Sequence, residues 1–342
     1  MDGRSDHLKH SIAVASLPDD VARAIVRLTS LHDGDLGVID AVVCGRRAVP
    51  ALRAILFNRE PSGLYETRRR AVEALTQLHA DDVLVDYLSA SRAIADPVER
   101  TGEEAVINAA ARAIATSRDR GVVPLLLQLA DRLAPLAGVV ETLGALKRIE
   151  ALPYFIKALA EDFTRSAAEA AIRSLGPQTR SALLTAASPH LTADEREPVS
   201  STRQRRSALR LYAEFGAPPD PDWPTLCRLT EDQDEWNAVL ACQICVKYGT
   251  ESARVGAAVR RLISLLSSAD WPLSEEIEDS LLKHFDRAKP VIEEVLQSGT
   301  TDAELGLVRA RTVRALFRVA ARAASNAHRE ANGRKPTVSS RS

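Results

Sequence analysis

The sequence predicts an all-α protein built from repeated helix pairs. Hydrophobic residues make up 45% of the chain, but aromatic residues make up only 4%. The apolar side chains are therefore mainly Ala, Leu, Val and Ile, which favour closely packed helices. A length of 342 residues indicates either two domains or one elongated array. Two recurring sequence patterns favour the array.

The first pattern is a helix start in which a proline stands between larger residues. Proline suits the first turn of a helix because the N–H that it lacks has no partner there. The pattern occurs at Pro50, Pro124, Pro153, Pro224 and Pro290. The intervals from Pro124 to Pro153 and from Pro224 to Pro290 correspond to a repeat of about 30–35 residues.

The second pattern is a helix with arginine at its first position, a small residue at its fourth and a large apolar residue at its eighth. It begins at Arg68, Arg165, Arg205 and Arg309. Glycines that end helices follow several such units, at Gly176, Gly216 and Gly249. Glycine after an apolar residue is typical of a helix C-terminus.

Together the two patterns resemble HEAT repeats, including the phycobilisome-lyase-like variety within the armadillo-type superfamily. The resemblance implies a right-handed α-solenoid of about eight helix pairs, each of which buries its apolar face against its neighbours. We expect the array over 20–324, with inserted polar loops near 92–103 and 188–203. A partly disordered leader over 1–19 and a basic, disordered tail over 325–342 complete the predicted organisation.

Composition also limits where the protein works. The first ten residues are polar and charged, without the apolar segment of a secretory signal. No apolar run approaches the roughly 18 residues of a membrane span, and four cysteines are too few for a disulfide framework. We expect a cytoplasmic protein that does not enter a membrane.

Signatures of catalysis are missing from the sequence. It contains no phosphate-binding glycine loop, no His-Glu-x-x-His and no Gly-x-Ser-x-Gly. HEAT-fold hydroxylases use His-Glu pairs, and none occurs here. We expect no catalytic residue, no cofactor and no metal.

Cys242 and Cys245 form a Cys-x-x-Cys, with Cys227 and His284 in adjacent units. Such a set could serve zinc or redox chemistry. Both cysteines lie within one apolar helical stretch, however, and buried cysteine behaves as a small hydrophobic residue. We favour the core interpretation.

The recurring arginines allow two interpretations. In HEAT repeats this arginine commonly pairs with an acidic residue near a turn, and Asp162 and Asp302 lie upstream of two of them. In the other interpretation, these arginines bind a ligand. We favour the structural role.

The last predicted helix has a stripe of arginines. Arg311, Arg314, Arg318 and Arg322 follow one another at helical spacing, and Arg329 continues the stripe. Like charges at this spacing repel, so another group should compensate them. The acidic runs at 275–279 and 293–294 are internal candidates, and an acidic partner or a phosphate backbone is the external one.

These observations predict a non-enzymatic scaffold or adaptor that binds a protein partner on its concave and C-terminal basic surface. We expect that partner to have an acidic surface. The candidate contact residues are Arg69, Arg70, Arg206, Arg210, Arg311, Arg314, Arg318 and Arg322. Two alternatives remain: a nucleic-acid-binding protein that contacts the phosphate backbone, and a phycobilin-lyase-like protein that attaches a chromophore, as the family resemblance implies.

Overall fold

The computed structural model describes residues 17–58, 65–90, 94–117, 121–189, 197–297 and 306–333, with side chains from 312 to 329 in the last of these segments. Eighteen α-helices and several short 3₁₀ helices make up the described secondary structure, and these residues contain no strand. The predicted all-α class is therefore confirmed. None of the described helices is both long and apolar enough to cross a membrane.

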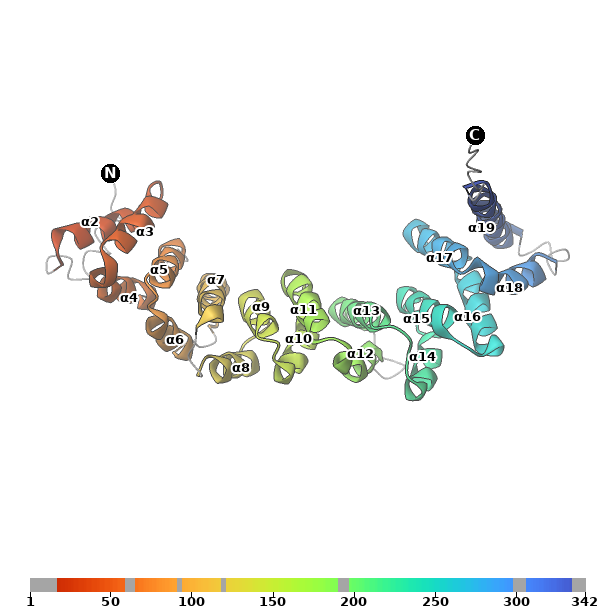
Figure 1. Cartoon of the computed structure of the whole chain (residues 1–342), viewed down its shortest axis with the longest axis horizontal. Coiled ribbons are helices and arrows are strands. Elements are labelled where there is room, and N and C mark those ends of the chain that lie inside the picture. Colours follow the sequence, from red (N-terminus) through yellow and green to blue (C-terminus); the bar gives the residue numbers. More distant parts are fainter. Residues whose placement is uncertain are drawn as a thin grey trace, which may run out of the picture. The chain divides into compact units, whose positions relative to one another are not determined.

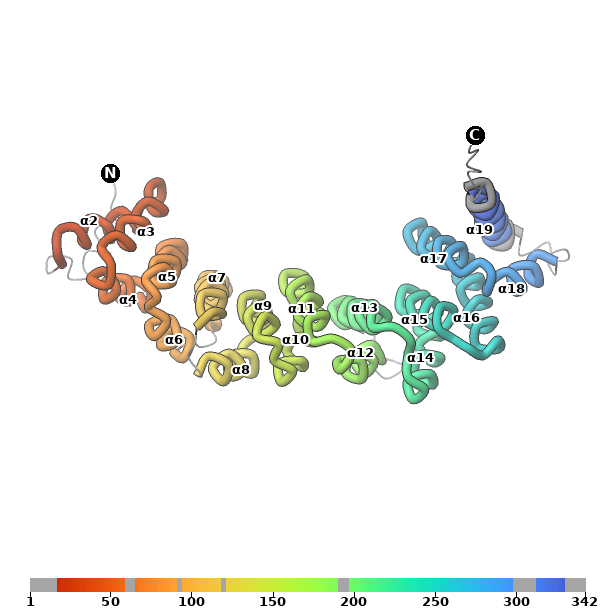
Figure 2. The backbone as a smooth tube through the Cα atoms, in the orientation of Figure 1, coloured from red at the N-terminus to blue at the C-terminus, as the bar shows by residue number. Residues whose placement is uncertain are grey.

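The chain divides into two compact units between residues 179 and 180. In each unit the helices follow one another in chain order (Figures 1 and 2). The even-numbered helices of unit 1 are α2 (Asp19–Leu28), α4 (Val49–Phe57), α6 (Asp81–Ser89), α8 (Val122–Arg132) and α10 (Leu152–Ala158). Its odd-numbered helices are α3 (Gly34–Val43), α5 (Glu66–Gln77), α7 (Pro97–Ala113), α9 (Ala137–Ala145) and α11 (Asp162–Leu175).

Unit 2 repeats this alternation. Its even-numbered helices are α12 (Arg180–Ala187), α14 (Trp223–Leu229), α16 (Ser252–Leu265) and α18 (Phe285–Gln297). Its odd-numbered helices are α13 (Val199–Glu214), α15 (Glu235–Tyr248), α17 (Trp271–Lys283) and α19 (Gly306–Gly333).

Each unit consists of one continuous row of odd-numbered helices backed by even-numbered ones. In unit 1, α3, α5, α7, α9 and α11 each contact the next helix of the row, and in unit 2 α13, α15, α17 and α19 do the same. The even helix of each pair packs on its odd partner, as α4 does on α5 and α14 on α15. Fully buried aliphatic side chains between the rows, such as Leu52, Leu75 and Leu226, form the core. Burial of each such side chain contributes about 1.5–3 kcal/mol.

The predicted second helices all fall in the odd row. The arginine-led segments that begin at 68, 165, 205 and 309 lie in α5, α11, α13 and α19. Gly176 and Gly216 have φ angles of +82° and +92°, the left-handed conformation that ends a helix at low cost only in glycine. Gly249 also follows its helix, but with a φ of −59°.

Four of the five proline starts are confirmed. Pro50, Pro153 and Pro224 are the second residues of α4, α10 and α14, and Pro124 lies in the first turn of α8. Pro290 is different because α18 begins five residues before it, at Phe285. The extra turn is held by Arg287, which donates to the carbonyl of Lys247 on α15 at 2.8 Å, and by the buried Ala288.

Three predicted boundaries are also wrong. Helix α7 begins at Pro97, capped by Asp96, inside the loop expected at 92–103. Helix α13 begins at Val199, inside the loop expected at 188–203. Helix α19 continues to Gly333, past the predicted start of the tail at 325. In each case polar residues that suggested a loop form the exposed face or the end of a helix.

Candidate partner-binding surface

The recurring arginines anchor α5, α11 and α13 to the end of the even helix before each of them. The Nε atoms of Arg68, Arg165 and Arg205 donate to the carbonyls of Leu56, Leu159 and Ala187 at 3.0, 3.0 and 2.8 Å. These carbonyls belong to last helical turns, which lack backbone partners and attract cations. The structural interpretation is confirmed for these three arginines, and the side chain of Arg309 lies outside the described residues.

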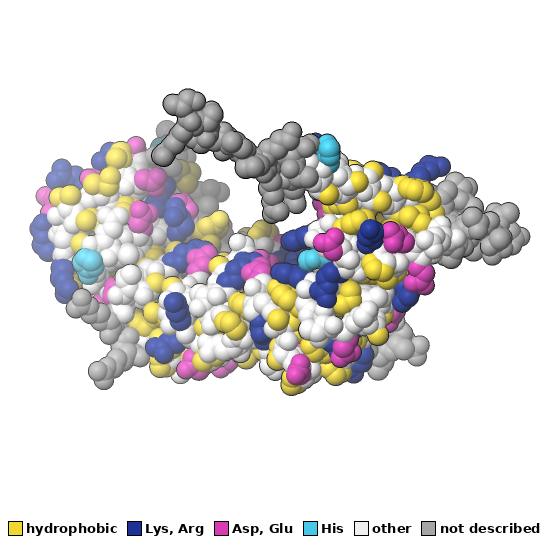
Figure 3. All heavy atoms as spheres, turned by 45° about the vertical axis from the view of Figure 1, so that its right-hand side comes forward, with side chains coloured by type: hydrophobic (Ala, Val, Ile, Leu, Met, Phe, Trp, Pro, Cys, Tyr) yellow, Lys and Arg dark blue, Asp and Glu magenta, His cyan; other side chains and the backbone are white. Residues whose placement is uncertain are grey.

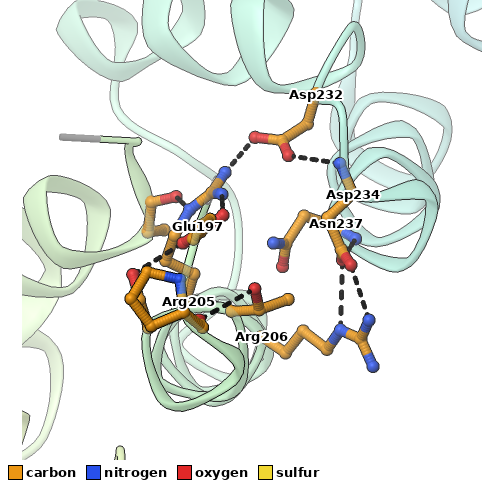
Figure 4. Close-up of polar contacts among 10 residues, drawn as sticks. Glu197, Arg205, Arg206, Asp232, Asp234 and Asn237 are labelled. Atoms are coloured by element: carbon orange, nitrogen blue, oxygen red, sulfur yellow. Dashed lines mark hydrogen bonds and ion pairs between the residues drawn. The ribbon is translucent and has the colours of Figure 1, made fainter. Parts of the chain in front are cut away.

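The outer nitrogens of the same guanidinium groups reach acidic side chains. Arg165 pairs with Asp162 at 2.7 Å, as the sequence predicted. Arg68 pairs with Glu103 of α7 at 2.7 Å. Arg205 pairs with Asp232 and, at 2.6 Å, with Glu197 (Figure 4). Burial raises the pKa of the Asp232 carboxyl, although the N–H of Asp234 and the guanidinium of Arg205 oppose this effect.

Arg206, a predicted contact residue, belongs to a second polar cluster in unit 2. Its guanidinium donates two hydrogen bonds to Asp234, at 3.1 and 2.6 Å, and lies 5.7 Å from the ring centre of Trp236. Asp234 also caps α15 by accepting from the N–H of Asn237 at 2.9 Å (Figure 4). Arg206 is therefore half-buried and committed to a bidentate ion pair.

The candidate arginines of unit 1 are also paired with acidic side chains of the chain itself. Arg69 pairs with Glu66 one turn earlier, at 2.7 Å, and this hydrogen bond lowers the pKa of the Glu66 carboxyl. Arg70 is only 7% exposed and donates to the carbonyl of Ser30 at 2.8 Å and to Asp35 at 3.0 Å. Its assignment to a partner-binding surface is wrong, because this guanidinium is used to close the end of α2.

The C-terminal stripe divides into paired and unpaired arginines. Arg318 donates to Glu278 and Arg322 to Asp279 at 3.0 Å, so the acidic run on α17 does compensate part of the stripe. Among the described side chains, Arg314 and Arg329 on α19 and Arg210 on α13 are exposed and form no ion pair. The side chain of Arg311 lies outside the described residues.

The cysteines behave as core residues. Cys242 and Cys245 are fully buried among aliphatic side chains of α15. Burial raises the pKa of the Cys245 thiol to about 12 and also raises that of Cys242. Burial lowers the pKa of His284, with nearby Lys283 adding to the effect. Within the described part of the chain, no three histidine, cysteine or acidic side chains come together as metal ligands.

Sequence reasoning missed a row of exposed apolar side chains where odd helices begin. We call these residues the N-terminal edge: Leu36, Tyr65, Val98 and Phe163 in unit 1, and Val199, Trp236 and Trp271 in unit 2. Phe163 is 96% exposed and Trp271 60%, whereas Trp236 is half-buried. These residues are spread along the sequence, and only their exposure in the folded chain shows that they belong to a recurring set.

Starts of neighbouring odd helices lie together because these helices run in the same direction. In unit 1, Arg70 in the second turn of α5 bonds to Asp35 in the first turn of α3. In unit 2, Glu235 at the start of α15 accepts from Ser268, just before α17, at 2.6 Å. On the N-terminal edge, the start of α3 therefore lies beside that of α5, and the start of α15 beside that of α17.

A hollow of about 460 Å³ lies on this edge in unit 2. The starts of α15 and α17 and the side chain of Arg206 on α13 form its walls. Its lining residues are Arg206, Gln233, Asp234, Glu235, Trp236, Ser268, Asp270 and Leu273. We call it the Trp236 pocket. It is open and mostly polar, and therefore suits a side chain of another protein better than an enclosed small molecule.

No protein-family model and no curated protein sequence matches this chain.

Proposed function

We propose that this chain is a scaffold that binds a protein partner, and that its two helical units are parts of a right-handed solenoid of HEAT-like repeats. The continuous odd-helix row within each unit and the repeated arginine anchor support the repeat interpretation. Stacked repeats present extended surfaces that suit other proteins. Binding, rather than catalysis, is the role that we assign to these surfaces.

The N-terminal edge is the observation on which this proposal depends. Exposed aromatic and aliphatic side chains recur near the starts of several odd helices, as Tyr65, Val98 and Phe163 illustrate, whereas Leu136 at the start of α9 is buried. Single exposed apolar residues are ordinary, but a recurring row is typical of a protein-binding surface. Aromatic residues are also enriched among the side chains that dominate binding energy.

The charge distribution favours a protein over a nucleic acid. Arg206, Arg318 and Arg322 are paired with acidic side chains, which reduces the positive charge that phosphate groups would meet. On the face drawn in Figure 3, basic, acidic and hydrophobic side chains are interspersed. A mixed surface of this kind is typical of protein interfaces.

The test is affinity capture by the full chain, using an edge variant and a matched control. Phe163→Ser with Trp271→Ser removes two exposed edge residues, and exposed positions tolerate such changes within about 0.5 kcal/mol of unfolding free energy. Val43→Ser with Phe317→Ser removes two exposed apolar residues away from the edge, since Val43 is the last residue of α3 and Phe317 lies within α19. We expect the wild type and the control to capture the same protein and the edge variant to lose it. Equal capture by the edge variant would contradict the proposal.

Nucleic-acid binding is the second candidate, because Arg210 and Arg314 are exposed and form no ion pair among the described residues. It predicts fluorescence anisotropy of a labelled DNA duplex that rises with protein at low salt and falls steeply with added salt. Arg210→Glu with Arg314→Glu should abolish that binding. Anisotropy that stays flat at low salt eliminates this candidate.

A further inference from the structure

The Trp236 pocket has an excess of negative charge on a surface that the sequence predicted to be basic. Its lining includes three carboxylates, from Asp234, Glu235 and Asp270, and one guanidinium, from Arg206. Arg206 neutralises Asp234. Glu235 and Asp270 form no ion pair in the described structure and accept only from Ser268 Oγ at 2.6 Å and from the N–H of Leu273 at 3.0 Å.

We propose that the Trp236 pocket receives a lysine or arginine side chain from the partner, so that the partner presents a basic segment here instead of the acidic surface expected from the sequence. The inference rests on the proposed function and names the chemistry of its partner in unit 2. Two uncompensated carboxylates on opposite walls attract one cation. The stem of a lysine or arginine fits an aromatic rim, because these side chains bury their methylene groups and keep the charge at the tip.

Two polar side chains behind the pocket wall are buried without hydrogen-bond partners. The amide nitrogen and oxygen of Asn237 and the hydroxyl of Ser274 are buried without a hydrogen-bond partner. Asn237 is 1% exposed and follows Trp236, and Ser274 follows Leu273, so both adjoin residues of the pocket lining. Figure 4 shows the Asn237 amide between the Arg205 cluster and the Arg206–Asp234 pair. A buried amide without partners costs about 1–3 kcal/mol. Neither side chain belongs to the pocket lining, so the wall would have to shift before a bound segment could reach them.

Aromatic side chains on both sides of the pocket supply the apolar part of the site. Trp236 lies in its wall, and Trp271, which is largely exposed, follows Asp270 directly. A cation near an indole face gains about 0.5–2 kcal/mol. Arg206 already occupies such a position, 5.7 Å from the ring centre of Trp236, and an incoming arginine would use Trp271 in the same way.

The experiment titrates the full chain with two short synthetic peptides that are identical except that one contains Arg and Leu and the other Glu and Leu. Calorimetry gives Kd. Tryptophan fluorescence locates the contact, since Trp223 is buried, Trp236 lines the pocket and the exposed Trp271 directly follows Asp270 of the lining. We expect the Arg peptide to bind and change the fluorescence and the Glu peptide to do neither. Equal affinity for the two peptides, or no binding of the Arg peptide at low salt, would overturn the inference.

Two charge variants make the test specific. Glu235→Gln with Asp270→Asn removes the two uncompensated charges and keeps a capping side chain at 270. This variant should raise the Kd of the Arg peptide about five-fold or more, as the loss of two exposed ion pairs implies. Asp286→Asn with Glu294→Gln makes the same change of net charge on α18, away from the pocket, and should leave Kd unchanged. Equal effects of the two variants on Kd would show that only net charge matters, and would overturn the assignment of the peptide to the Trp236 pocket.

The two proposals fail in distinguishable ways. If the captured partner is lost from the edge variant but stays bound to Glu235→Gln with Asp270→Asn, the scaffold function stands and the basic-segment assignment is wrong. If the Arg peptide binds as expected but the edge variant still captures the partner, the pocket assignment stands and the edge is not the partner's surface.

Discussion

The guanidinium of Arg68 on α5 lies 2.7 Å from the carboxylate of Glu103 on α7, and both side chains are almost completely buried. The same guanidinium donates to the carbonyl of Leu56 at 3.0 Å and to the hydroxyl of Tyr87 at 2.9 Å. One arginine thus connects the end of α4, the core of α6 and the next odd helix. Three structural elements depend on a single planar donor.

Arg68→Ala should be strongly destabilising, by about 3–5 kcal/mol, because it leaves the carboxylate of Glu103 buried without its cation. Arg68→Lys should recover only part of this loss, since an ammonium group cannot match three acceptors in a fixed plane. Urea unfolding followed by circular dichroism measures both changes. A loss below about 1 kcal/mol for Arg68→Ala would contradict the proposed importance of this connection.

The repeated arginine should differ in importance from unit to unit. Arg205 is buried between two carboxylates, whereas Arg165 is half-buried and its partner Asp162 is exposed. We expect Arg205→Ala to cost about 3–5 kcal/mol and Arg165→Ala about 1 kcal/mol or less. The same unfolding measurement compares them, and equal losses would show that the shared helix-end hydrogen bond dominates over the ion pair.

Two helical glycines should respond to alanine in opposite directions. A Cβ atom at Gly37 on α3 would lie 2.2 Å from the backbone nitrogen of Leu28, so Gly37→Ala must push α2 and α3 apart. Overpacking of this kind costs about 1–3 kcal/mol. At Gly256 on α16 the nearest atom would be at 3.5 Å, so Gly256→Ala should stabilise by about 0.5–1 kcal/mol through helix propensity. Thermal unfolding of the two variants shows whether each substitution lowers or raises the stability of the protein.

Native thiol labelling should modify one cysteine quickly. Cys227 is exposed, whereas Cys44, Cys242 and Cys245 are buried. Burial raises the pKa of the Cys44 thiol and raises that of Cys245 to about 12, which keeps the reactive thiolate scarce at neutral pH. A maleimide followed by mass spectrometry should show one fast adduct in the native state and four after denaturation. Rapid labelling of Cys242 or Cys245 would contradict the core interpretation.

Acid should weaken the Glu66–Arg69 pair. The hydrogen bond from Arg69 holds the pKa of the Glu66 carboxyl below its ordinary value of 4.5. The stabilisation is therefore present above pH 4.5 and is lost as the pH falls through the lower folded-state pKa. Because the pair is partly exposed, Glu66→Gln should cost less than about 1 kcal/mol at neutral pH. The difference in unfolding free energy between Glu66→Gln and the wild type should shrink in acid. A difference that grows would contradict the predicted direction of the pKa shift.

Local sequence was sufficient for the fold class and for most helix starts. Proline in a first turn acts through its own ring, and glycine after a helix acts through its own φ, so Pro50, Pro153 and Gly176 could be interpreted without their neighbours. The Arg-led helix was recognisable because Arg68, Arg165 and Arg205 perform the same anchoring task. Boundaries near 97, 199 and 325 were misplaced, since a charged helical face and a polar loop have similar composition.

The roles of individual arginines could not be predicted in the same way. Arg69 and Arg70 are adjacent in sequence, yet one is half-buried beside Glu66 and the other closes the end of α2. Arg318 and Arg314 share a helical stripe, but only Arg318 lies opposite Glu278 on α17. Such differences depend on which helix lies across the interface, and helical periodicity contains no information about the neighbour.

The sequence by itself determined that the chain forms helix pairs and that one arginine in each of several pairs has a structural task, because propensity, capping and periodicity act over a few residues. Only the tertiary structure decided which charges remain available to a partner. Packing of the odd helices brings Asp234, Glu235 and Asp270 together beside Trp236 while it pairs Arg206 internally. The sign of a surface charge depends on pairing between separate segments, and that pairing exists only after the helices have packed.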